Sequence, residues 1–125
     1  MKDIIIIVSV LNVIFFIMHE FDAFYHREWI MFKFLRHLKE NTQFLIFLYL
    51  HIPLLLLIVY YLWSVYNLDN IILWIVWNIL MIAHLVIHLF ALRWKTTVFN
   101  SVHSFILIGA AASTGLVNLL LVNYY

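Results

Sequence analysis

Residues 71–92 read IILWIVWNILMIAHLVIHLFAL, an uncharged stretch whose main polar interruptions are Asn78, His84 and His88. At about 1.5 Å per residue, a helix of this length crosses the ~30 Å hydrocarbon core of a bilayer. Water is absent from that core, so the backbone groups must form hydrogen bonds within the segment, which favours a helix. The stretch therefore predicts a transmembrane helix.

Three further apolar stretches have the same character, and they cover residues 4–23, 44–66 and 98–122. Polar residues at 67–70 and 93–97 form short connections, so the last three spans should be antiparallel neighbours. We therefore predict an all-α protein, an integral membrane four-helix bundle, as a single domain over residues 1–125.

The composition excludes several classes of protein. Hydrophobic residues make up 67% of the chain and charged residues 10%, with a mean hydropathy of +1.07. A water-soluble domain with a polar surface does not easily reach these values. The chain has no cysteine, which excludes disulfides and thiolate metal sites. It also has no run of Lys and Arg of the kind that follows a nucleic acid backbone, so we expect no nucleic acid partner.

The basic residues predict how the bundle is oriented. An even number of spans places both termini on one side of the membrane. Lys2 is the only basic residue on that side, whereas the connections at the other end carry Arg27, Lys33, Arg36, Lys39, Arg93 and Lys95. The positive-inside rule then places these connections in the cytoplasm and both termini outside.

The connection at residues 26–40 mixes apolar side chains such as Trp29 and Leu35 with basic ones such as Arg36. This mixture predicts an interfacial helix that lies along the cytoplasmic headgroup layer. A helical continuation of the first span into the cytoplasm is the alternative.

Most histidines fall near one end of the predicted spans. They are His19, His26, His51, His84, His88 and His103, with Glu20, Asp22 and Glu28 beside them. Helical rise places the histidines of the four spans roughly 6 to 12 Å below the cytoplasmic surface. Ionisable groups inside hydrocarbon are costly and usually mark a function. The sequence therefore predicts a functional site in this layer.

The spacing of these residues favours a metal site. His84 and His88 are four residues apart and share one helix face, a common arrangement for two ligands of one ion. Nitrogen and oxygen donors suit a divalent metal, zinc first and iron or manganese as alternatives. The predicted metal ligands are His19, Asp22, His51, His84, His88 and His103. Glu20 or Glu28 is the predicted catalytic base toward a metal-activated water.

Small residues from Gly109 to Gly115 mark the last span. They allow another helix to approach closely, either inside the bundle or in a homo-oligomer.

Four short motifs carry a resemblance to a family. They are HEFDAFYHREW at 19–29, HIPL at 51–54, HLVIH at 84–88 and SVHSF at 101–105. Together they resemble the small bacterial four-helix membrane proteins related to the HXXEE family, although a literal HXXEE string is missing. The resemblance implies a bacterial membrane protein whose histidines and carboxylates belong to one site, and it implies no particular chemistry.

The leading functional hypothesis is a metal-dependent membrane hydrolase whose substrate is a membrane lipid or another apolar molecule entering from the bilayer. An ion or proton relay through the same groups is the second hypothesis. A non-catalytic membrane interaction subunit is the third. Haem, which would also need histidine ligands, is not expected.

Overall fold

The computed structural model describes residues 1–93, 101–122 and 124. Its elements in chain order are the α-helix α1 (Lys2–Tyr25), the short 3-10 helices η1 (Glu28–Met31) and η2 (Lys33–Leu35), and the α-helices α2 (Glu40–Asn67), α3 (Ile71–Ala91) and α4 (Val102–Val122). All four α-helices are long and apolar enough to cross a membrane. This confirms the predicted all-α fold with four candidate spans. Within the predicted 98–122 span, residues 98–100 lie outside the described part, as do Trp94 and Lys95 of the preceding connection.

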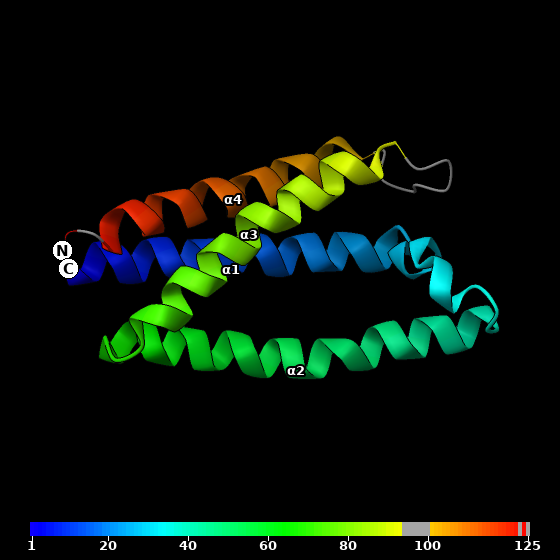
Figure 1. The fold of residues 1–125 in the computed structure, drawn as a ribbon, viewed down its shortest axis with the longest axis horizontal. Coiled ribbons are helices and arrows are strands. Elements are labelled where there is room, and N and C mark those ends of the chain that lie inside the picture. Colours follow the sequence, from blue (N-terminus) through cyan, green and yellow to red (C-terminus); the bar gives the residue numbers. More distant parts are fainter. Residues whose placement is uncertain (94–100, 123, 125) are drawn as a thin grey trace.

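Helices α1, α2 and α4 run roughly along the long axis, and α3 crosses them obliquely; the start of α1 and the end of α4 lie at the same end of the bundle (Figure 1). Helix α4 makes the most extensive contacts, and its partners are α1 and α3. Helix α2 lies on the other side of α1 and contacts the bundle less. The bundle is therefore a packed group of three helices with α2 beside it.

Polar side chains join the three packed helices in the half nearer the termini. The indole Nε1 of Trp77 donates to Oδ1 of Asn12 at 2.8 Å, and the amide of Asn12 donates to the carbonyl of Ala111 at 2.6 Å. These bonds satisfy polar groups that hydrocarbon could not solvate. A Cβ on Gly115 would lie 3.2 Å from the carbonyl oxygen of Asn78, so the absence of a side chain allows α4 to approach α3 closely. Small residues of α4 thus pack inside the bundle, and the homo-oligomer stays a prediction.

The turn between α2 and α3 is short because both helix ends are completed locally. Leu68 adopts a left-handed conformation with φ of 60° and ends α2. The Asn70 side chain then accepts a hydrogen bond from the amide of Leu73 at 3.0 Å, which caps the start of α3. The chain therefore reverses direction here as predicted, but α3 diverges obliquely from α2 after the turn (Figure 1).

The connection between α1 and α2 differs from the predicted single helix. Arg27, with φ of 57°, ends the helical path after α1, so α1 does not continue into this segment. Phe32 is extended and separates η1 from η2. Buried Trp29 packs on Phe47 of α2, whereas buried Met31 packs on Ala91 of α3. Packing of this connection against two helices therefore favours two short helical turns over one regular amphipathic helix. The position of the connection at the membrane surface stays a prediction.

Candidate metal centre

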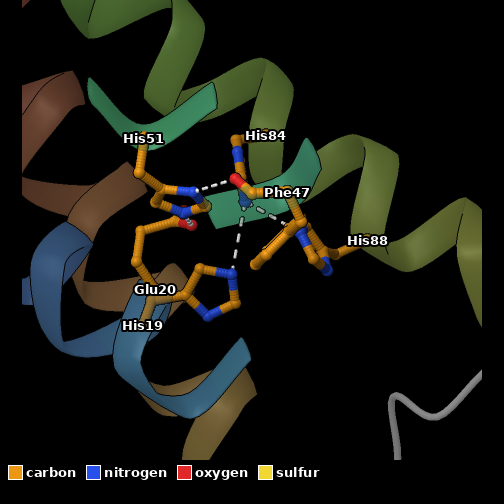
Figure 2. A network of polar contacts seen from close by, with 6 residues as sticks. All are labelled: His19, Glu20, Phe47, His51, His84 and His88. Carbon is orange, nitrogen blue, oxygen red and sulfur yellow. Dashed lines mark hydrogen bonds and ion pairs between the residues drawn. The ribbon is translucent and has the colours of Figure 1, made fainter. Parts of the chain in front are cut away.

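Three histidine side chains converge near the end of the bundle opposite the termini. His19 comes from α1, and His84 and His88 come from successive turns of α3 (Figure 2). Each offers a ring nitrogen, and these atoms all lie within 4.8 Å of one another. The Nε2 atom of His84 lies 3.3 Å from Nε2 of His19 and 2.7 Å from Nε2 of His88. We call these residues the three-histidine cluster.

The Nε2 atom of His84 cannot complete hydrogen bonds to both of its histidine neighbours. A bond between two ring nitrogens needs a hydrogen on one of them and a lone pair on the other. The Nε2 atom of His84 carries one hydrogen or one lone pair, yet it faces both His19 and His88. It can therefore complete one strong bond of the two. A cation that accepts three lone pairs would satisfy all three nitrogens at once.

The spacing of the nitrogens suits a small divalent ion. Nitrogens bound at 2.0–2.1 Å to a tetrahedral zinc ion lie roughly 3.3 Å apart. The separation between His19 and His84 is 3.3 Å, which matches this value, and the 2.7 Å between His84 and His88 would have to widen by about 0.6 Å. His19 is 1% exposed and His88 8% exposed. The donor set is thus preformed inside the protein.

Glu20 and His51 form a separate pair beside the cluster (Figure 2). The Nδ1–H of His51 donates to the carbonyl of Phe47 at 2.7 Å, because a carbonyl oxygen can only accept. The Nε2 atom of His51 lies 2.8 Å from Oε2 of Glu20. A proton must lie between these two atoms, since a nitrogen lone pair would repel the carboxylate. His51 therefore contacts the carboxylate of Glu20. It lies outside the three-histidine cluster, although the sequence predicted it as a metal ligand.

Glu28 is the second carboxyl group at the site, and it lies in η1. Burial, and to a smaller extent the nearby carboxylates of Glu20 and Asp22, raise the pKa of Glu28 to about 9. At neutral pH its carboxyl group holds a proton. This protonation suits a proton donor, whereas the sequence analysis gave Glu20 or Glu28 as the base; the catalytic role of either residue stays a prediction.

A cavity of about 540 Å³ connects these groups. The three-histidine cluster, Glu20 and Glu28 line it. Apolar side chains supply most of the remaining wall, and they are Met31, Phe32, Phe34, Phe47, Ile87 and Ala91. Its volume lies in the range of roughly 300–1,000 Å³ that is typical of small-molecule sites. The cluster thus faces a space that can hold a ligand.

Comparison with known proteins places the chain in a family. A family model described as a family of unknown function (DUF6713) matches residues 5–125. The chain belongs to this family. No curated protein and no solved structure matches it. The relation of this DUF6713 chain to the HXXEE family stays a prediction.

Two of the predicted ligands of the DUF6713 chain lie apart from the cluster. Asp22 accepts a hydrogen bond from the hydroxyl of Ser104, and its carboxylate lies 3.3 Å from Nδ1 of His26. His103 is exposed on α4. Among the described residues, the group that could hold a metal contains neither of them. The structure thus brings candidate ligands together from α1 and α3, and not from all four helices as the sequence suggested.

The sequence held a signal for the position of His103. Ser104 and Asn118 recur at helical spacing and both are buried in α4. A residue adjacent to Ser104 points about 100° away from that face.

The sequence analysis did not identify the Phe47 carbonyl or the aromatic wall around it. The four-residue spacing from Phe47 to His51 within one helix could have identified the former.

Proposed function

We propose that this DUF6713 protein binds one divalent metal ion through Nε2 of His19, His84 and His88. Zinc is the favoured ion, and iron or manganese are alternatives, because imidazole nitrogens suit all three. The observation that carries the proposal is the convergence of three Nε2 atoms, at 3.3 and 2.7 Å, from two different helices. Three protein ligands leave an ion free to bind a further group, as catalytic metal sites do.

The reaction class that fits best is hydrolysis of an apolar substrate drawn from the membrane. A bound divalent ion would supply a Lewis acid and activate water. Glu20 lines the cavity and is positioned by His51 to accept a proton from the water. The water oxygen bonds to the substrate's carbonyl carbon or phosphorus, and the bond to the leaving oxygen breaks. Protonated Glu28 is suited to supply the proton that the leaving oxygen needs.

An aromatic barrier favours this proposal over a relay through the bundle. Phe16 packs edge-on against both His84 and Trp77, with ring centroids 5.7 and 5.6 Å away. Trp77 belongs to the polar group around Asn12. An apolar ring therefore separates the cluster from the buried polar groups nearer the termini.

We further propose that the site lies near the cytoplasmic leaflet of a bacterial cytoplasmic membrane, with both termini outside. The cluster lies toward the end of the bundle that carries the α1–α2 and α3–α4 connections. The described basic residues of these connections are Arg27, Lys33, Arg36, Lys39 and Arg93. Lys2 lies at the opposite end, so the asymmetry follows the positive-inside rule.

Elemental analysis of detergent-purified protein tests the metal. We expect about one zinc, iron or manganese ion per chain in the unmodified protein. The double variant His84→Ala, His88→Ala should lose the ion, and His103→Ala should keep it. Circular dichroism checks that each variant retains its helices. A well-folded, metal-free protein that takes up no added Zn²⁺ would overturn the proposal.

A further inference from the structure

The cavity is lined by both polar and apolar side chains. His19, His84 and His88 are among the polar ones, whereas Phe34 and Phe47 belong to its apolar wall. Such a lining suits a molecule with one polar head and one apolar chain. The charge near the three histidines then decides which kind of head the cavity accepts.

The candidate ligands carry no negative charge of their own. Among the described residues, the group that could hold a metal contains three imidazoles and no carboxylate. Two nearby carboxylates have other partners: Oε2 of Glu20 lies 2.8 Å from Nε2 of His51, and Asp22 accepts a hydrogen bond from Ser104. A divalent ion held by neutral imidazoles therefore gains no negative charge from its ligands, and it attracts anions strongly in surroundings of low dielectric constant.

Lys33 adds a second positive charge, because its side chain also lines the cavity. It lies in η2, next to the cavity residue Phe34. A cationic side chain and a metal ion that line the same cavity both attract an anion placed between them. Lys33 therefore extends the preference for an anionic group to the rim of the cavity.

The apolar wall reaches the outer surface of the bundle. Ile87 of α3 is 59% exposed and Phe34 is 69% exposed, yet both line the cavity. An apolar chain that follows these two residues can continue from the cavity into the surrounding lipid. A head group inside and a chain leading outward match an amphiphile that enters from the bilayer.

We propose that the cavity binds an anionic amphiphile, with a carboxylate or phosphate head at the metal and Lys33 and an apolar chain along Phe47, Phe34 and Ile87. The inference rests on the proposed metal site and names the class of ligand that it binds; in a hydrolysis, a phosphate ester would be a substrate and a carboxylate a product. Carboxylate and phosphate heads share the anionic chemistry that the cavity recognises, and the experiment below separates them.

Competition for a fluorescent fatty acid tests this class. Zinc-loaded protein in a non-ionic detergent is titrated with dansyl-aminoundecanoic acid, and the bound probe is then displaced by dodecanoate, dodecyl phosphate, dodecanol or dodecyltrimethylammonium. We expect the two anions to displace the probe and the neutral and cationic compounds to fail at the same concentration. The stronger of the two anions identifies the preferred head. Equal displacement by dodecanol would overturn the inference.

Two lysine variants locate the head group. Lys33→Gln should weaken probe binding by about tenfold, because it removes one charge-assisted contact. Lys39→Gln is the matched control, since Lys39 is also exposed and does not line the cavity. Equal binding by both variants would place the probe elsewhere and overturn the inference.

The variant Ala91→Leu should reduce probe binding by filling the cavity. The metal content of this variant reports whether the site still folds.

Metal content measured on the same samples separates the two proposals. Bound zinc without a preference for anions would overturn the inference and leave the metal site intact. Absence of zinc uptake would overturn the proposed function. In that case, a preference for anions that disappears in Lys33→Gln would still support the ligand class.

Discussion

The Nε2 atom of His51 lies 2.8 Å from Oε2 of Glu20, and this contact joins α2 to α1 beside the three-histidine cluster. Both ring nitrogens of His51 are used, because Nδ1 donates to the carbonyl of Phe47. Helix α2 makes fewer contacts with the bundle than α4 does. The pair therefore helps to hold α2 at the wall of the cavity.

Replacing either member of this pair should destabilise the protein. The side chains of His51 and Glu20 are 13% and 15% exposed, so water compensates little for the lost bond. We expect Glu20→Gln or His51→Ala to lower the free energy of unfolding by about 1.5–3 kcal/mol. Unfolding measured in detergent for both single variants and the double variant gives the coupling energy.

The ion pair of Arg27 with Glu40 is the matched control for this cycle. Its side chains are 56% and 52% exposed. Exposed ion pairs typically contribute about 0–1 kcal/mol. A coupling energy for His51 and Glu20 no larger than that of the control would contradict the structural role assigned to them.

Glu28 should make stability depend on pH in a defined direction. Its pKa rises from 4.5 to about 9 on folding, so between these values the folded state binds more protons than the unfolded state. The free energy of unfolding of metal-free protein should therefore fall as the pH rises through this window. Glu28→Gln should flatten the dependence, and exposed Glu40→Gln should leave it unchanged. Thermal unfolding at a series of pH values measures this dependence. Identical profiles for the unmodified protein, Glu28→Gln and Glu40→Gln would show that Glu28 is not buried in the folded state.

Gly115 and Gly109 should respond differently to the same substitution. A Cβ on Gly115 would lie 3.2 Å from the backbone carbonyl of Asn78, whereas a Cβ on Gly109 would meet nothing within 4 Å. We expect Gly115→Ala to destabilise the bundle by about 1–3 kcal/mol through overpacking. Gly109→Ala should be neutral or stabilising by up to about 1 kcal/mol, because alanine favours a helix. Thermal unfolding compares the two, and a smaller loss for Gly115→Ala than for Gly109→Ala would be incompatible with the packing of α4.

The orientation can be tested by cysteine labelling, since the chain has no cysteine of its own. Lys39→Cys should resist a membrane-impermeant maleimide in intact cells and react after permeabilisation. Lys2→Cys should react with intact cells, if both termini lie outside as proposed. The reverse pattern would place the basic connections outside the cell.

The sequence determined the helices and part of the site. Apolar length and the need to satisfy backbone groups in lipid predicted the four spans, because both depend on neighbouring residues alone. The four-residue spacing of His84 and His88 likewise predicted that they share a face, and the structure brings both to one point.

Tertiary structure decided which other histidines reach that point. Helical spacing gives the angles between side chains on one helix, but packing sets the rotation of each helix about its axis. The buried face of α4, with Ser104 and Ile108, turns exposed His103 away from the interior. Packing of Trp29 on α2 and Met31 on α3 likewise decided the path of the connection and formed one wall of the cavity. These outcomes depend on contacts between residues distant in sequence, which no local pattern encodes.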